Sequence, residues 1–237
     1  MVSNLRLRET RTPALSPEEV QAMDRFWAAA VKRQPALFDG PAVACLSVDA
    51  GPDGHLDLAW ARISYRYRAL RQVSGASWRP ASLFVTVLQP VSGGGLIVGR
   101  GSATTAHPGR WALPGGSVEP PGTGGLLDAG ALRFHAVREL AEEVGVAVRP
   151  DAVAGWGVTR GEHGNIGIHF IAPPLASEAV FTHHRGLVEA ERGRGAAPEL
   201  DRLAVVRCER DVAALGDTAD FLAPAVARYA HGERGCF

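Results

Sequence analysis

Runs of apolar residues, and the turns between them, predict where the first elements of the chain lie. A helix is expected to begin after Ser16, because this capping residue is followed by a proline and, three positions after the cap, by Glu19. The helix should end near Pro35. Two strand-like runs follow at residues 43–49 and 56–65, with a turn rich in Gly, Pro and Asp between them. One helix and one hairpin are therefore expected in this part of the chain.

A second series of apolar runs and turns begins at Ala81. Two apolar strands are predicted at residues 82–90 and 95–100, and the glycine-rich turn between them predicts a hairpin. After an irregular stretch, a helix is expected at about residues 131–144, with Gly145 as a left-handed stop just past its end. Its predicted apolar stripe is Phe134, Val137, Leu140, Ala141 and Val144.

Further elements are predicted downstream of this helix. Strands are expected at residues 153–160, 166–174 and 203–209, and a closing helix at residues 218–232. The strands do not alternate regularly with helices, which favours an α+β fold with a mixed sheet between helices. We expect a small helix-and-hairpin unit at residues 1–80 and a main domain at residues 81–237.

Composition narrows the class of protein. Lys+Arg and Asp+Glu are both 25, so the formal charge of the 237-residue chain is zero, which argues against binding to nucleic acid. Three distant cysteines, Cys45, Cys208 and Cys236, show no metal-ligand spacing. No signal-peptide core is present, and no run approaches the roughly 18 apolar residues of a membrane span. A cytoplasmic protein without membrane contact is expected.

Three carboxylates are predicted on one face of the helix at residues 131–144. Glu139, Glu142 and Glu143 are three and four positions apart. The last helical turn disfavours anions, and Arg138 can pair with Glu142 but cannot neutralise all three. A hard cation such as Mg²⁺ would neutralise them. The alternative is a solvated acidic face.

A second informative segment is Trp111–Glu119, WALPGGSVE. Gly115 and Gly116 allow close backbone approach, so an exposed carbonyl here could be a further metal ligand. Glu119 adds a fourth carboxylate, and the alternative is a plain turn.

Together, WALPGGSVE and RELAEEVGV resemble the signature of the Nudix hydrolases. Every position of the signature's second half is met, from Arg138 to Val146. The resemblance implies an α/β/α sandwich with a mixed sheet, and Mg²⁺-dependent hydrolysis (with Mn²⁺ as a possible substitute) of a nucleoside diphosphate linked to another moiety. It also implies that Glu139, Glu142, Glu143 and the Gly115 carbonyl hold the metal. Arg138 would orient the glutamates, and Glu142 and Glu143 would act in catalysis.

The spacing departs from that signature. Gly116 precedes Arg138 by 22 positions, where the family has 14, so about eight extra residues lie between them. They are expected to form a loop at residues 120–130 that does not join the helix. Strict spacing places glycines where the family has its first glutamate, and Glu119 or Asp128 could replace it.

Other residues are candidates for the site by chemistry and position. Arg100, Arg110 and Arg160 could contact phosphate, because guanidinium matches phosphate oxygens. His107 is a candidate substrate contact, and Glu199 a candidate base in the polar segment before the strand at residues 203–209. The two histidines at residues 183 and 184 are expected to lie on the solvated surface.

The substrate and the role of the first 80 residues remain open. Residues 34–41 and 63–67 are similar to the region before the Nudix domain in the animal UDP-sugar-cleaving members of the family. Residues 1–80 are expected to cover the nucleoside or sugar of a small-molecule substrate such as UDP-glucose or an ADP-ribose-like compound, or to form a homodimer surface. The alternatives are a non-catalytic Nudix-fold nucleotide sensor and a coenzyme A pyrophosphatase, since residues 96–110 partly resemble the latter group.

Overall fold

Two β-sheets form the centre of the protein. The structure is a computed structural model that describes residues 4–51 and 54–232. The larger sheet has the order β1-β3-β2-β4-β9-β8, with β7 also paired to β4. Its strands are β1 (Asn4–Glu9), β2 (Pro41–Ala50), β3 (His55–Ser64), β4 (Ala81–Leu88), β7 (Gly115–Ser117), β8 (Ala154–Arg160) and β9 (Ile166–Ile171). The smaller sheet has the order β10-β5-β6, from β5 (Leu96–Gly101), β6 (Trp111–Ala112) and β10 (Leu200–Val206).

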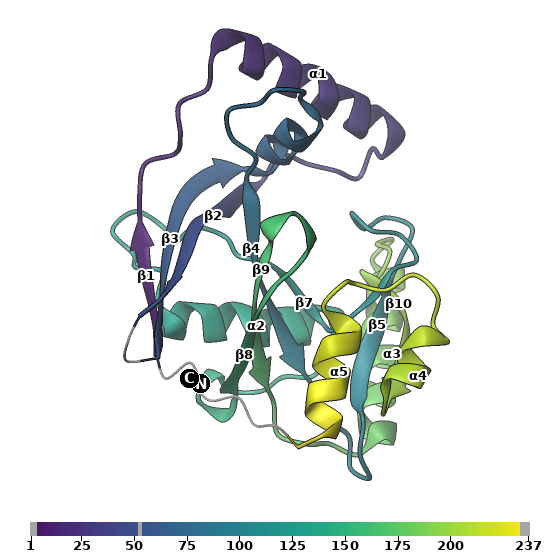
Figure 1. Ribbon diagram of the computed structural model, residues 1–237. Coiled ribbons are helices and arrows are strands. Elements are labelled where there is room, and N and C mark those ends of the chain that lie inside the picture. The colour runs from purple at the N-terminus through teal and green to yellow at the C-terminus, as the bar shows by residue number, and fades with distance from the viewer. Residues whose placement is uncertain (1–3, 52–53, 233–237) are drawn as a thin grey trace.

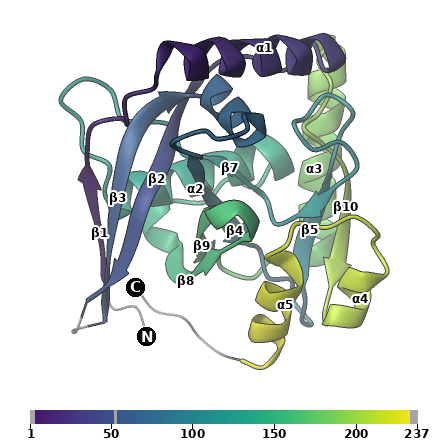
Figure 2. The ribbon, with the colours of Figure 1, turned by 45° about the horizontal axis from the view of Figure 1, so that its top comes forward.

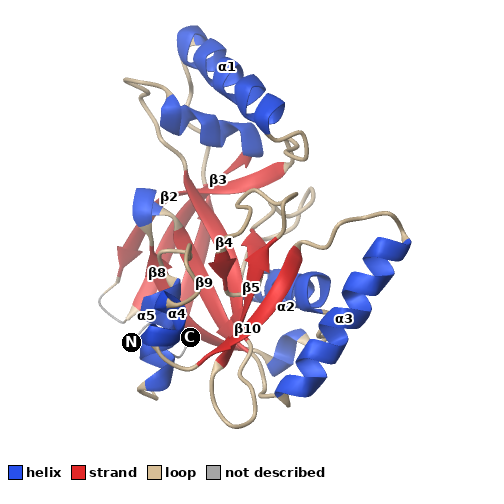
Figure 3. Cartoon of the chain, turned by 90° about the vertical axis from the view of Figure 1, so that its right-hand side faces the viewer, coloured by secondary structure: helices blue, strands red, loops and turns tan. Residues whose placement is uncertain are grey.

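The larger sheet is mixed, as the sequence predicts. Strands β4 and β9 run parallel, as do β1 and β3, while the neighbouring pairs are antiparallel. The helices are α1 (Pro17–Arg33), α2 (Ala129–Val144), α3 (Ser177–Gly193), α4 (Glu209–Ala213) and α5 (Leu222–Ala230), with 3₁₀ segments η1 (Tyr65–Gln72), η2 (Pro150–Ala152) and η3 (Glu162–Gly164). Helices α2 and α5 lie on opposite sides of the strands (Figures 1 and 3). The α+β prediction is therefore confirmed, and none of the described helices has the length and apolar character needed to cross a membrane.

Helix α2 is fixed by its ends and by one buried face. The Asp128 side chain accepts a hydrogen bond from the backbone N–H of Ala131 at 2.8 Å, and Gly145 ends the helix with a φ of 77°. Its buried stripe is Leu132, Ala136, Leu140 and Val144, which belong to the same core cluster as Leu83, Val85 and Val87 of β4. Phe134, predicted on the apolar stripe, is instead 59% exposed, because it points away from the sheet.

The described residues before residue 80 form α1, η1 and the strands β1, β2 and β3. Ser16 and Glu19 form the predicted capping box of α1. Helix α1 and η1 lie beyond one end of β2 and β3 (Figure 2) and share a small apolar cluster that includes Met23 and Leu70. Strand β2 joins β4 through two residue pairs, so the strands on either side of the predicted boundary at residue 80 belong to one sheet.

The hairpin predicted at residues 82–90 and 95–100 is present only next to its turn, where Pro90 and Leu96 form an antiparallel bridge. Strands β4 and β5 are joined by a tight turn, with the N–H of Val91 bonded to the carbonyl of Gly95 at 3.1 Å. Beyond the turn the strands part into different sheets, where β4 pairs with β2, β7 and β9, and β5 pairs with β6 and β10. The glycine-rich turn was identified correctly, but it connects two sheets.

The polar segment after β9 contains a helix that the sequence analysis did not predict. It forms the 17-residue helix α3, and His184 on that helix is buried, with Nε2 3.1 Å from the carbonyl oxygen of Leu200. The solvated surface expected at residues 183–184 is therefore wrong for His184. The following strand is shifted to residues 200–206, and the closing helix is shorter than the predicted 218–232.

Candidate active site

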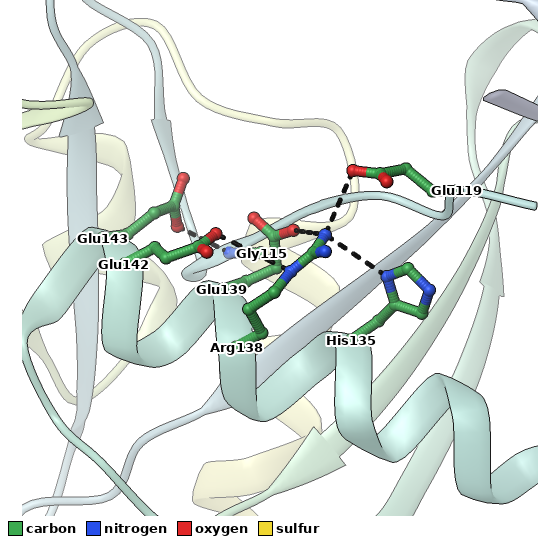
Figure 4. A network of polar contacts seen from close by, with 7 residues as sticks. All are labelled: Gly115, Glu119, His135, Arg138, Glu139, Glu142 and Glu143. Atoms are coloured by element: carbon green, nitrogen blue, oxygen red, sulfur yellow. Dashed lines mark hydrogen bonds and ion pairs between the residues drawn. The ribbon is translucent and has the colours of Figure 1, made fainter. Parts of the chain in front are cut away.

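Three glutamates project from the C-terminal half of α2 toward β7. Glu139 and Glu143 are buried, with 9% and 8% of their surface exposed, whereas the Glu142 side chain is 58% exposed. Figure 4 shows the three carboxylates on the side of the helix that faces the Gly115 backbone. The predicted shared face is therefore present, and two of its three members are withdrawn from solvent.

The Gly-Gly pair of β7 makes this burial possible. The N–H of Gly115 donates a hydrogen bond to Oε2 of Glu143 at 2.7 Å. A Cβ at Gly116 would lie 2.5 Å from Oε2 of Glu139, so only glycine leaves room for that carboxylate. A Cβ at Gly115 would lie 2.1 Å from the carbonyl oxygen of Val85. Both glycines are needed for the close approach of β7 to its neighbours, which a plain turn would not require.

Arg138 sits among the carboxylates. Its guanidinium is 3.2 Å from Glu119, 3.3 Å from Glu139 and 3.7 Å from Glu142, and an NH2 group lies 3.4 Å from Nδ1 of His135 (Figure 4). The predicted pairing of Arg138 with Glu142 is present. Glu143 is outside this network, so its charge has no cationic partner among the described residues.

Burial raises the pKa of both Glu139 and Glu143. Burial raises the pKa of Glu139 to about 7 against the opposing effect of Arg138, with Glu142 and Glu199 adding to the rise. Burial also raises the pKa of Glu143 well above its ordinary value, although the Gly115 N–H opposes it. These carboxylates thus carry a burial cost that a bound cation would offset.

The structure shows no preformed metal centre. No group of three or more His, Cys, Asp or Glu side chains in the described ranges is arranged to hold a metal ion. The two buried and incompletely compensated carboxylates nevertheless have the chemistry that Mg²⁺ favours, which is oxygen donors with negative charge. The Gly115 contact recorded here is made by its N–H, so a role for its carbonyl stays a prediction.

Glu119 and Asp128, the two candidates for the missing first glutamate, lie in different places. The carboxylate of Glu119 reaches Arg138. Asp128 is instead the N-cap of α2, and its Oδ1 accepts from Ala131. The intervening residues form a loop without helix, as predicted, and α2 begins only at Ala129. Of the two, Glu119 is therefore the one that joins the acidic network.

A cavity of about 390 Å³ lies beside Glu143. Glu143, Gly115 and Gly116 line one part of it, together with Glu199 from the segment before β10. Glu199 is therefore close to the α2 carboxylates although it follows Glu143 by 56 positions. Burial raises the pKa of Glu199, and the charges of Glu142 and Glu191 add to this effect.

Two other predicted residues line the same cavity, and two do not. His107 and Arg110 lie on its wall, in the loop between β5 and β6. Burial lowers the pKa of His107, and the positive charges of Arg110 and Arg68 lower it further. Arg100 forms a bidentate ion pair with Asp201 and, like Arg160, is not among the lining residues.

Several lining residues were missed by the sequence interpretation. They are Tyr65, Arg68, Ser82, Phe84, Asn165 and Phe221. They come from η1, from β4, from the turn before β9 and from the start of α5, so tertiary packing brings them together. Only Tyr65 carried a signal, because it falls within residues 63–67, the segment similar to the UDP-sugar-cleaving enzymes.

Comparison with known proteins gives structural likenesses without a sequence match. No protein-family model and no curated protein matches the chain. The Nudix domain of Shewanella oneidensis NrtR, solved with ADP ribose, has 14% identity and a TM-score of 0.41, over 66% of this chain and 91% of that one. A bifunctional NMN adenylyltransferase/ADP ribose pyrophosphatase from Francisella tularensis, solved with AMP and a Mn ion, has 17% identity and a TM-score of 0.44, over 71% of this chain and 46% of that one.

A third similar structure is a MutT/Nudix family protein from Enterococcus faecalis. It has 14% identity and a TM-score of 0.35, over 57% of this chain and 47% of that one. The chain thus matches about half the length of the Enterococcus and Francisella proteins. Likenesses with TM-scores below 0.5 fix neither a family nor an activity, which depend on the residues of the site.

Proposed function

We propose that the protein is a Nudix pyrophosphohydrolase that cleaves the diphosphate linkage of a nucleoside diphosphate derivative with the help of Mg²⁺. One observation carries the proposal: the buried carboxylates of Glu139 and Glu143 meet the Gly115–Gly116 backbone at the wall of a cavity. This arrangement joins the two separated halves of the sequence signature in space. If the carboxylates only formed a solvated acidic face, they would stay hydrated and would not be buried against the glycine backbone.

Each residue has a role in the proposed reaction. Glu139, Glu142 and Glu143, with the carbonyl of Gly115, would hold the cation. A bound Mg²⁺ supplies neutralisation of the phosphate charge and a lower pKa for a coordinated water. Arg138 positions Glu139 and Glu142 through its two ion pairs.

The cavity places further groups around the substrate. Glu199 would accept the proton of the attacking water, a role that its raised pKa favours at neutral pH. His107 and Arg110 would contact the substrate from the loop between β5 and β6. We propose a small molecule as substrate, either a nucleoside diphosphate sugar or an ADP-ribose-like compound, and the cytoplasm as the location.

A substrate panel tests the proposal. The protein is incubated with Mg²⁺ and UDP-sugars, ADP-ribose, dinucleotides, coenzyme A or oxidised dNTPs, and the products are identified by mass spectrometry. We expect two phosphorylated products from at least one nucleoside diphosphate derivative. Glu143→Gln should lower turnover by orders of magnitude, whereas Glu178→Gln, on the exposed surface of α3, should not change it. Cleavage of coenzyme A alone would support the alternative pyrophosphatase.

A nucleotide sensor without catalysis is the second candidate. The altered spacing before Arg138, which places glycines where the family has its first glutamate, is the observation that favours it. Such a protein would bind a member of the panel without forming products, and Mg²⁺ would not raise its melting temperature. Mg²⁺-dependent product formation that is lost in Glu143→Gln would exclude this candidate.

A further inference from the structure

Arg68 projects from the N-terminal part of the chain into the candidate active site. It lies on η1, and it lines the cavity that Glu143 also lines. An NH2 group of Arg68 donates a hydrogen bond to the hydroxyl of Ser117 at 2.9 Å. Ser117 directly follows the Gly-Gly pair, so this bond places a positive charge one residue away from the backbone that meets the α2 carboxylates.

The Arg68 side chain is held in place without being neutralised. Its guanidinium carbon lies 4.3 Å from the centre of the Tyr65 ring, a stacking contact that fixes the plane of the group. Arg68 forms no ion pair with a carboxylate in the described ranges. Arg66, two positions earlier on η1, contrasts with it, because Arg66 pairs with Asp24 and Asp39.

The positive charge of Arg68 is part of a larger cationic wall. Arg68 and Arg110 are both close enough to lower the pKa of His107, and all three residues line the cavity. Arg110 lies 4.0 Å from Asp217, and its buried Nε has no hydrogen-bond partner. The lining of the cavity therefore includes guanidinium groups as well as carboxylates.

We propose that Arg68, oriented by Tyr65, binds a phosphoryl group of the substrate in the cavity that Glu143 also lines. This inference rests on the proposed function, because that reaction requires a diphosphate in the cavity. A guanidinium with free N–H donors matches phosphate oxygens, and the hydrogen bond to Ser117 leaves most of its donors available. Arg68 is thus a substrate-binding residue supplied by the first 80 residues, and Tyr65 is a positioning residue.

Binding of uncleavable analogues tests this assignment. The α,β-methylene analogues of ADP and UDP keep two phosphoryl groups, and their affinity is measured by calorimetry with Mg²⁺ at two salt concentrations. Arg68→Met should raise the Kd of the better analogue at least tenfold and weaken its salt dependence. Arg68→Lys should retain part of the affinity, and Tyr65→Leu should raise the Kd less than Arg68→Met does. Arg66→Met, the matched control on the same 3₁₀ segment, should bind as the wild type does.

The outcomes separate this proposal from the proposed function. Melting curves first establish that each variant is folded, and Arg68→Lys serves if Arg68→Met is not. A Kd within twofold of the wild type in Arg68→Met, an equal loss in Arg66→Met, or no binding by the wild type overturns the phosphate assignment. If that happens while Glu143→Gln still abolishes hydrolysis, the proposed function stands. Binding that depends on Arg68 without any hydrolysis supports the anion site and removes the proposed function.

Discussion

The backbone N–H of Gly115 donates a 2.7 Å hydrogen bond to the Glu143 carboxylate across a sequence separation of 28 residues. This bond connects β7 to the last turn of α2 and holds the carboxylate against the cavity wall. It is the sole hydrogen bond of the Glu143 side chain in the described part of the chain. The glycine pair and the acidic helix are therefore one structural unit, although a loop separates them in the sequence.

The two glycines of β7 should respond differently to the same substitution. Gly116→Ala places a Cβ against the Glu139 carboxylate, which can move, so we expect lower turnover and weaker Mg²⁺ binding with a nearly unchanged melting temperature. Gly115→Ala places a Cβ against the Val85 backbone at a φ of 153°, so we expect clear destabilisation. Assays and melting curves of both variants check this. An unaffected Gly116→Ala enzyme would contradict the proposed role of Glu139.

Substitution of Glu119 should lower activity, whereas substitution of Asp128 should lower stability. Glu119→Gln removes one of the charges around Arg138, so turnover should fall severalfold while the free energy of unfolding hardly changes, since this exposed ion pair contributes little stability. Asp128→Ala removes the N-cap of α2 and should cost about 1 kcal/mol of stability. Urea unfolding and steady-state kinetics of the two variants test the distinction. A larger loss of activity in Asp128→Ala than in Glu119→Gln would contradict it.

Glu199→Gln should lower kcat by about 10²-fold, the order expected for loss of a general base. Burial raises the Glu199 pKa above its ordinary value, and a base must be deprotonated to act. Activity of the wild type should therefore decline as the pH falls through that raised pKa, and the variant should lose this acidic limb of its pH profile. Glu189→Gln and Glu191→Gln are the controls, because neither residue lines the cavity. Full turnover in Glu199→Gln would rule out Glu199 as the general base.

His169 should make the protein sensitive to acid. The ring is fully buried between the hydroxyls of Thr86 and Thr159, each 2.7 Å from a ring nitrogen, and burial lowers its pKa to about 4, with Arg228 adding to the effect. In the unfolded chain the ring takes up a proton near pH 6.5. The neutral buried ring therefore favours the folded state above that pH. Roughly 3 kcal/mol of the free energy of unfolding is lost as the pH falls from about 6.5 to about 4.

Urea unfolding at steps of pH measures this loss. His169→Gln should be less stable than the wild type at pH 7, because the packing and the two hydrogen bonds are altered, but its stability should fall less steeply below pH 6.5. His183→Gln, on the exposed face of α3, serves as the control and should keep the wild-type slope. Equal slopes for the wild type and His169→Gln would contradict the assignment of the buried neutral ring.

Local signals explain which elements were predicted well. The capping box of α1 and the Gly145 stop of α2 are set by residues adjacent in sequence, and both are present. Helix α3 was missed because Ala176 offers no side-chain cap and the helix buries only Val180 and His184 along its polar length. The pairing of β4 and β5 was misjudged because a turn fixes only the residues next to it, whereas the sheet partners are chosen by distant strands.

The site was predictable to the extent that its residues share a motif. Glu139, Glu142 and Glu143 lie on one helix face, so helical periodicity alone brings them together. Arg68 could not be found in this way, because η1 reaches the cavity only through the packing of the first 80 residues on the sheet. Arg100 is the opposite case. The sequence made it a candidate for phosphate contact, but in the structure its guanidinium forms an ion pair with Asp201.

The contact between β2 and β4 has a consequence for dissecting the protein. Strand β4 is covered on this side by only two residue pairs of β2, and Tyr65 and Arg68 complete the cavity wall beyond them. Cutting the chain at residue 80 would leave a fragment with the whole acidic helix and both glycines. Strand β4 would keep its pairing with β7 and β9, but Ala81 and Ser82 would lose their partners in β2. Such a fragment would retain every residue of the acidic helix and the glycine pair but would lack Tyr65 and Arg68 from the cavity wall, so the proposed site extends beyond its sequence motif.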